Sequence, residues 1–260
     1  MTILEKLADS TRERVKQAKQ KISFESIRAQ ALSLNKGSFE FERALNHEGL
    51  SFICECKKAS PSKGLIAEKF PYLQIARDYE SSGADCISVL TEPEFFMGSN
   101  EYLKEIAECV NVPCLRKDFT IDEYMIYEAK TLGASAVLLI CSILDENNLK
   151  EYISICDSLG LSALVEAHDE QEINFALKAG ARIIGVNNRN LKDFTVDTEN
   201  SKKLRKLIPS DVLFVSESGI KTPEDVRKVY EIGADAVLIG ETLMKSPDKR
   251  KTLAELKSLL

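Results

Sequence analysis

The sequence predicts an α/β fold, a single (β/α)8 TIM barrel with an N-terminal helical extension. Short apolar runs recur along the 260 residues and alternate with segments that carry helix-start signals. Four of the runs follow a Gly-Ala pair, at Gly83, Gly133, Gly180 and Gly233, spaced roughly fifty residues apart. Glycine relieves the left-handed backbone at a helix end, and each interval has room for two strand–helix units. Eight such units close into a barrel through right-handed crossovers.

The expected strands are unbroken apolar runs, as parallel strands buried on both faces require. They cover residues 52–57, 86–90, 113–117, 135–140, 162–166, 182–187, 212–217 and 235–240. Between them, Thr120, Asp169 and Thr222 stand where helix N-caps are expected, each with acidic residues in the following turn. An open doubly wound sheet is the alternative. It predicts a glycine-rich dinucleotide turn after an early strand, and the sequence has none.

The chain divides into residues 1–48, a helical extension packed on the barrel, and residues 49–260, the barrel itself. Helical character covers residues 4–15 and 23–34. We expect these helices to plug the bottom of the barrel or to cover its mouth. A separate binding domain is the alternative, but fifty residues rarely sustain a core of their own.

Composition narrows the class of protein. The net charge of −6 argues against a nucleic-acid surface, and no apolar run is long enough to suggest a signal peptide or a membrane span. Seven scattered cysteines suggest core residues in a reducing compartment, so we expect a cytoplasmic protein. The two histidines, His47 and His168, lack metal or triad spacing, and Cys54 and Cys56 are too close for a zinc finger. We therefore expect no metal and no cofactor.

Five of the predicted strands end in a side chain that carries charge or donates hydrogen bonds. These endings are Lys57, Lys117, Glu166, Asn187 and Glu217, and the first strand adds Glu55. A polar group at the end of a buried strand costs free energy unless it is partnered or used. The carboxyl ends of barrel strands carry the catalytic groups, so we expect all six residues around one cavity. Glu55 and Lys57 should point the same way and pair. A purely structural ring of ion pairs is the alternative.

Glycines also follow the last two predicted strands. Ser218-Gly219 and Gly240-Glu241 bring backbone amides to the barrel end where such folds frequently bind phosphate. Ordinary turn chemistry would explain each glycine alone. Their matching positions favour a phosphorylated small molecule as the ligand.

Six motifs then carry a resemblance to a known family. They occupy residues 55–64, 88–92, 115–119, 164–168, 185–191 and 216–220. In this order they resemble the indole-3-glycerol phosphate synthase family of tryptophan biosynthesis, and the match runs from the extension to the eighth unit. Ala167 departs from the family pattern, where a branched residue is common, and touches no expected role.

The resemblance implies ring closure, decarboxylation and dehydration of 1-(2-carboxyphenylamino)-1-deoxyribulose 5-phosphate to indole-3-glycerol phosphate. Ring closure needs an acid for the ribulose carbonyl, and Lys117 is the first choice. Dehydration needs a second acid and a base, from the Glu55–Lys57 pair or Glu166. Which lysine serves which step stays open.

The resemblance also implies Asn187, Glu217 and Ser218 as further catalytic residues, together with residues that bind the substrate. Asn187, Glu217 and Ser218 would position substrate or hold the electrostatic network, and Arg189 with Ser60 would lie near the anthranilate carboxylate or a mobile first loop. Phe96, Phe119 and Leu238, with Leu138 and Ile140, would wall the anthranilate slot, although the last three suit ordinary core equally. Residues 58–64 are expected to form a flexible flap, in which Lys58 and Lys63 are solvated.

Other functions remain open at this point. Phosphoribosylanthranilate isomerase and histidine-pathway isomerases are phosphosugar barrels too, but they use Cys/Asp or Asp/Asp pairs. A non-catalytic phosphosugar-binding barrel would need neither Lys117 nor Glu166. We expect a monofunctional monomer or weak oligomer, with association with other tryptophan-pathway enzymes left open.

Overall fold

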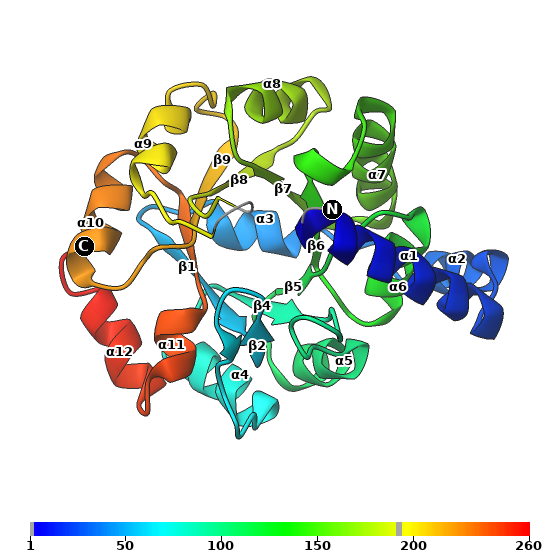
Figure 1. Cartoon of the computed structure of the whole chain (residues 1–260), viewed down its shortest axis with the longest axis horizontal. Helices are drawn as coiled ribbons and strands as arrows, with labels where there is room; N and C mark the ends of the chain where they lie inside the picture. Colours follow the sequence, from blue (N-terminus) through cyan, green and yellow to red (C-terminus); the bar gives the residue numbers. More distant parts are fainter. Residues whose placement is uncertain (1–2, 191–193) are drawn as a thin grey trace.

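Eight parallel strands close into a barrel in the computed structural model, which describes residues 3–190 and 194–260 (Figure 1). In order around the barrel they are β1 (Ser51–Cys56), β4 (Cys86–Leu90), β5 (Cys114–Lys117), β6 (Ala136–Ile140), β7 (Ser162–Ala167), β8 (Ile183–Asn187), β9 (Leu213–Glu217) and β10 (Ala236–Ile239), which pairs back with β1. The predicted (β/α)8 fold is confirmed. Each strand begins and ends within one residue of its expected range.

Helices alternate with the strands and form the outer ring in Figure 1. They are α4 (Tyr72–Ser81), α5 (Asn100–Cys109), α6 (Glu123–Thr131), α7 (Glu146–Leu159), α8 (Glu170–Lys178), α9 (Glu199–Arg205), α10 (Pro223–Glu231), α11 (Glu241–Lys245) and α12 (Lys249–Leu256), with a short 3₁₀ turn η1 (Cys141–Ile143) after β6. None of the helices within residues 3–190 and 194–260 has the length and apolar character that a membrane crossing requires.

Two of the three expected helix caps are present. Thr222 forms the full capping box with Asp225 at α10, and Asp169 caps α8. Thr120 does not cap α6. The backbone is still extended at Asp122, so the helix begins later and the Asp122 carboxylate accepts the Tyr124 N–H at 2.9 Å.

Strand alternation separates two layers of core. Outward side chains such as Ile87 and Val165 pack under the helices, whereas inward ones such as Ile53 and Leu164 fill the barrel. Glu55 lies two residues beyond Ile53 on β1 and therefore also points inward, at the carboxyl end.

The N-terminal extension both plugs the barrel and covers its mouth. It consists of α1 (Ile3–Lys21), α2 (Phe24–Ser33) and α3 (Glu40–Leu45). Helix α3 closes the amino end: its backbone contacts Ser162 at the start of β7, and its buried Phe41 and Leu45 join the inner core. Helix α1 contributes residues to the cavity at the opposite end, and Figure 1 shows it running outward from the barrel centre. The proposed division at residues 48 and 49 falls between α3 and β1 and stays a prediction.

Candidate active site

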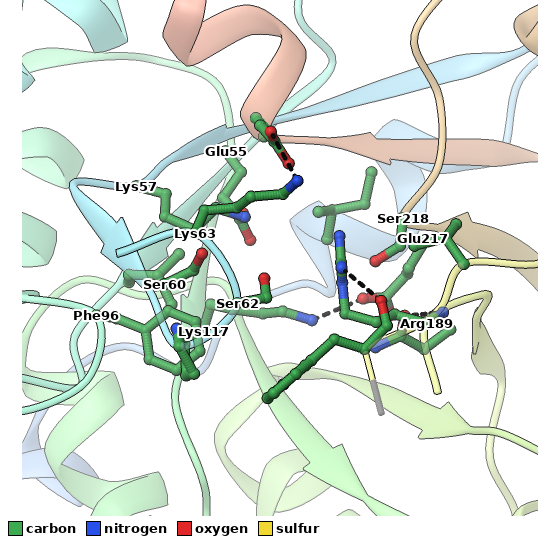
Figure 2. A pocket seen from close by; sticks show the side chains of 18 of the residues that line it. Glu55, Lys57, Ser60, Ser62, Lys63, Phe96, Lys117, Arg189, Glu217 and Ser218 are labelled. Carbon is green, nitrogen blue, oxygen red and sulfur yellow. Dashed lines mark hydrogen bonds and ion pairs between the residues drawn. The ribbon is translucent and has the colours of Figure 1, made fainter. Parts of the chain in front are cut away.

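A cavity of about 530 Å³ opens at the carboxyl ends of the strands, within the size range of small-molecule sites (Figure 2). Every residue that the sequence predicted for the site lines it: Glu55, Lys57, Ser60, Phe96, Lys117, Phe119, Glu166, Asn187, Arg189, Glu217, Ser218, Gly219, Leu238, Gly240 and Glu241. Leu138 and Ile140 line it as well. Leu191, the last residue of one family motif, lies outside the described residues.

Strand β1 supplies an ion pair. Lys57 Nζ donates to Glu55 Oε1 at 2.5 Å, as the two-residue spacing predicted, and Glu55 is almost fully buried. A Cβ atom on Gly240 would lie 2.4 Å from Glu55 Oε1, so only glycine lets the loop after β10 approach this pair. The loop at Gly240-Glu241, where phosphate binding was predicted, is therefore in direct contact with the Glu55–Lys57 pair.

Lys117 lies between two carboxylates at the centre of the cavity. Its Nζ is 2.6 Å from Glu217 Oε2 and 3.2 Å from Glu166 Oε2. Burial alone would lower the pKa of Lys117, but the facing carboxylates of Glu217 and Glu166 raise it above its usual value. Lys117 is therefore an ammonium in the free protein.

The two carboxylates differ in their other partners. Glu166 Oε1 accepts from Asn187 Nδ2 at 3.1 Å and lies 3.2 Å from His168 Nε2. Burial opposes its ionisation, but Lys117 and His168 outweigh burial and hold the pKa of Glu166 well below its usual range. For Glu217, burial prevails over Lys117 and, with Glu166 nearby, raises the pKa to about 7. Its Oε1 atom has no hydrogen-bond partner in the described part of the chain.

The loop after β9 is held in an unusual conformation. Ser218 has φ +67° and Gly219 has φ +91°, both in the left-handed region. Asn188 Nδ2 donates to the Ser218 carbonyl at 3.1 Å and to Ser216 Oγ, which fixes the turn. Such strain in a non-glycine residue is typical of functional loops.

Arg189 extends from the end of β8 over the same cavity (Figure 2). Its backbone N–H donates to Asn187 Oδ1 at 3.0 Å, and its Nη1 donates to the Phe194 carbonyl at 3.1 Å. These contacts place a guanidinium, whose N–H groups are all donors, at the cavity wall.

An apolar wall completes the cavity. Phe96 and Phe119 lie with ring centroids 6.0 Å apart. The fully buried Glu92 organises the loop that carries Phe96, because its carboxylate accepts the backbone N–H groups of Glu94, Phe95 and Phe96. Glu92 belongs to the family motif at residues 88–92, but the sequence alone did not indicate that it organises this loop.

Other lining residues were missed. Ile3, Leu4 and Leu7 of α1 reach the cavity, and so does Lys63, whose Nζ lies 3.8 Å from Glu241 Oε1. Lys63 belongs to the loop after β1, which forms a small hairpin of β2 (Ala59–Ser60) and β3 (Gly64–Leu65). Amphipathic spacing could have identified the apolar face of α1, but nothing in the sequence states which end of the barrel it covers.

Fold and site together define an enzyme of the (β/α)8 class, with lysines and carboxylates around a cavity at the carboxyl ends of its strands. The model of the family "Indole-3-glycerol phosphate synthase" matches residues 4–256. The chain belongs to this family and is a lyase, a carboxy-lyase of tryptophan biosynthesis, as its motifs predicted.

Individual relatives agree with the family match. The chain is 60% identical over 256 residues to indole-3-glycerol phosphate synthase of Ruminiclostridium cellulolyticum, covering 98% of each chain. It is 50% identical to the enzyme of that name from Lachnoclostridium phytofermentans, covering 99% of this chain and 100% of the relative. Among solved structures, 3-hexulose-6-phosphate synthase from Salmonella typhimurium matches with TM-score 0.65 at 14% identity, over 81% of this chain and 98% of that one, which shows the shared fold alone.

Proposed function

We propose that this chain converts 1-(2-carboxyphenylamino)-1-deoxy-D-ribulose 5-phosphate to indole-3-glycerol phosphate, releasing carbon dioxide and water. The observation that carries the proposal is the Lys117 ammonium, held at 2.6 Å and 3.2 Å between two carboxylates in a cavity with an aromatic wall. An ammonium in that position is a ready acid for a carbonyl oxygen. Family membership supports the same reaction.

Ring closure forms one carbon–carbon bond. The aromatic carbon that bears the carboxylate attacks the ribulose C2 carbonyl, and Lys117 gives its proton to the carbonyl oxygen, which becomes a hydroxyl. Loss of the carboxylate as carbon dioxide returns its bonding electrons to the ring and restores aromaticity. Phe96 and Phe119 would hold the ring, and Arg189 with Ser60 would hold its carboxylate until that step.

Dehydration then completes the indole. The new hydroxyl leaves as water after it takes a proton from an acid, and the neighbouring C1 loses a proton to a base. The Lys57–Glu55 pair can supply both groups, because it brings an amine and a carboxyl group together at the cavity, with Lys57 Nζ 2.5 Å from Glu55 Oε1. Glu166 is the second candidate for the base. Asn187 and Glu217 would keep Glu166 and Lys117 in place.

The phosphate would rest on backbone amides of two loops. The left-handed turn at Ser218-Gly219 and the turn at Gly240-Glu241 both border the cavity. The Glu241 carboxylate is occupied by Lys245 at 2.6 Å, which limits its repulsion of an anion.

A turnover assay tests the proposal. Purified protein is incubated with the carboxyphenylamino-deoxyribulose phosphate, and indole fluorescence is followed. Lys117→Met should lower kcat by at least about a hundredfold, since general acid catalysis contributes that much. Lys104→Met, which changes an exposed lysine of α5, is the matched control and should leave turnover unchanged.

Three results would count against this proposal. A well-folded wild-type protein that forms no indole would remove the reaction, and one that binds the compound unchanged would point to a binding barrel. An active Lys117→Met variant would remove Lys117 as the essential acid.

We also propose a cytoplasmic location and a monomeric or weakly associating state, with pathway enzymes as the candidate partners. The absence of a membrane-crossing helix in the described ranges is consistent with the location. Cell fractionation and light scattering would test the two statements separately.

A further inference from the structure

His168 lies immediately behind the proposed catalytic carboxylate. It follows the last residue of β7, and its imidazole stands between two glutamates. Nε2 is 3.2 Å from Glu166 Oε1, and Nδ1 is 2.9 Å from Glu172 Oε2 on α8. The side chain is 18% exposed and lies outside the set of residues that line the cavity. It therefore contacts the site through Glu166 and not through the substrate.

Two helices fix the position of this histidine. Glu172 Oε2 also accepts the His168 backbone N–H at 2.8 Å, so one carboxylate holds both the main chain and the ring. From α9, Asn200 Nδ2 donates to the His168 carbonyl at 3.1 Å. Because main chain and ring are both anchored, the imidazole cannot follow Glu166 if that carboxylate turns away.

Carboxylates dominate the surroundings of the ring. Glu166 faces it from β7 and Glu172 from α8, and the neutral amide of Asn187 on β8 and Lys117 on β5 lie beyond Glu166. From η1, the Cys141 thiol donates to the Glu172 carbonyl and is uncharged, because burial raises its pKa. Burial alone would lower the pKa of His168, but the two glutamates raise it to about 10. The ring is an imidazolium at neutral pH.

We propose that His168 is a positioning residue of the active site: a fixed imidazolium, anchored by Glu172, that keeps Glu166 ionised and turned toward Lys117 and Asn187. The inference rests on the proposed function. The Nε2 atom of His168 lies within ion-pair distance of Glu166, and this contact helps hold the pKa of Glu166 below its usual range.

The reaction explains why a second cation is needed. When Lys117 gives its proton to the substrate, Glu166 loses one of its two neighbouring positive charges. Without His168, the pKa of Glu166 would rise and the carboxylate would compete for that proton. With His168 charged, Glu166 stays ionised through the step and remains able to stabilise the Lys117 ammonium when its proton is restored.

Proton NMR tests the charge independently of turnover. The chain has two histidines, so His47→Asn leaves the ring signals of His168 alone in the spectrum. His47 lies before β1, at the opposite end of the barrel. We expect the His168 ring signals to stay at their protonated positions from pH 6 to pH 8. A midpoint below pH 7 would overturn the inference.

Kinetics test the effect on Glu166. In His168→Gln the loss of kcat that comes from protonation of Glu166, an acidic limb at lower pH than that of Glu217, should begin about one pH unit higher, because loss of a nearby cation raises a carboxylate pKa by that order. kcat at neutral pH should fall about tenfold or more, with KM changed less than about twofold. His168→Lys, which retains a positive charge, should keep the wild-type limb, and His47→Asn should match wild type.

The outcomes are distinguishable. If His168→Gln loses stability but its acidic limb stays in place, the role is structural and the inference is wrong. An inactive wild-type protein would overturn the proposed function and this inference with it. A neutral His168 in an active enzyme would overturn this inference alone.

Discussion

Two carboxylates share one ammonium at the centre of the site, and their remaining contacts make them unequal. Glu166 has Asn187 and His168 as further partners, whereas one oxygen of Glu217 has none in the described part of the chain. When two buried acids interact this strongly, the one with more partners for its charge stays ionised and the other takes up a proton first. Glu217 is therefore the group whose charge changes near neutral pH.

This inequality makes a prediction about stability. The pKa of Glu217 in the folded protein is about 7, above the value near 4.3 of an unfolded glutamate. Its contribution to the free energy of unfolding is therefore full below about pH 4 and is lost as pH rises through 7. Glu217→Gln should gain stability relative to wild type between pH 5 and pH 8 while losing activity.

Urea unfolding of wild type and Glu217→Gln at pH 5 and at pH 8 measures the difference in their free energies of unfolding. Glu224→Gln, which changes an exposed acid of α10, should show no such pH-dependent gain. A Glu217→Gln variant whose stability tracks wild type at both pH values would contradict the assignment.

Helix α1 lies over the cavity and is held there by ion pairs to the barrel. Arg14 holds it to the residue after Lys117, through contacts of 2.8 Å and 2.6 Å to the two oxygens of Asp118. Lys19 adds a contact of 2.7 Å to Asp122. Asp118 also lies 3.6 Å from the buried Arg116 and accepts from Thr91, so it belongs to a network that joins α1, β5 and the loop after β4.

We expect Arg14→Met to loosen this helix. The change keeps the apolar stem but leaves the buried Asp118 with one guanidinium partner, which should cost about 1–3 kcal/mol of unfolding free energy. Because Ile3, Leu4 and Leu7 would no longer be held over the cavity, KM should rise several-fold. Chemical denaturation and steady-state kinetics measure the two effects.

Arg12→Met is the matched control, since Arg12 is exposed and pairs with Asp9, which is exposed as well. This substitution should change neither the free energy of unfolding nor KM by much, because surface ion pairs contribute little to stability. Equal effects of the two substitutions would show that the Arg14 contact does not hold the helix.

At the scale of the whole molecule, barrel closure brings together groups that are far apart in the chain. Glu55 and Glu217 come from opposite ends of the sequence, yet β1 and β9 both pair with β10. The chain carries a net charge of −6, while its cavity concentrates Lys57, Lys117 and Arg189. Binding an anion there should stabilise the entire barrel, because the site exists only when all of these strands are closed.

Inorganic phosphate is the probe for this linkage. At a concentration about a hundred times its Kd, it should add about 2.7 kcal/mol to the free energy of unfolding. Gly240→Ala should abolish the gain, because the added Cβ would lie 2.4 Å from Glu55 Oε1 and displace the loop. Thermal unfolding across a phosphate titration measures it.

Ser154→Ala on the exposed face of α7 is the control and should respond like wild type. Full stabilisation of Gly240→Ala by phosphate would contradict the proposed site.

The sequence was sufficient for the strands and for the residues at their ends. Buried parallel strands must be apolar throughout, so Lys117 or Glu166 at the end of such a run was visible as an exception without any coordinates. Thr120 shows the limit: cap residues were recognised by type, but where the helix begins depends on backbone that is still extended at Asp122.

By itself, therefore, the sequence determined the barrel, its family and the residues at the strand ends, because alternation, caps and polar strand endings are local patterns. Only the tertiary structure decided how these groups are partnered: that Glu166 and Glu217 share Lys117, that His168 stands behind Glu166, and that α1 covers the cavity. Those relations depend on distances between segments that the closed barrel brings together, and charge interactions act through distance rather than through position in the chain.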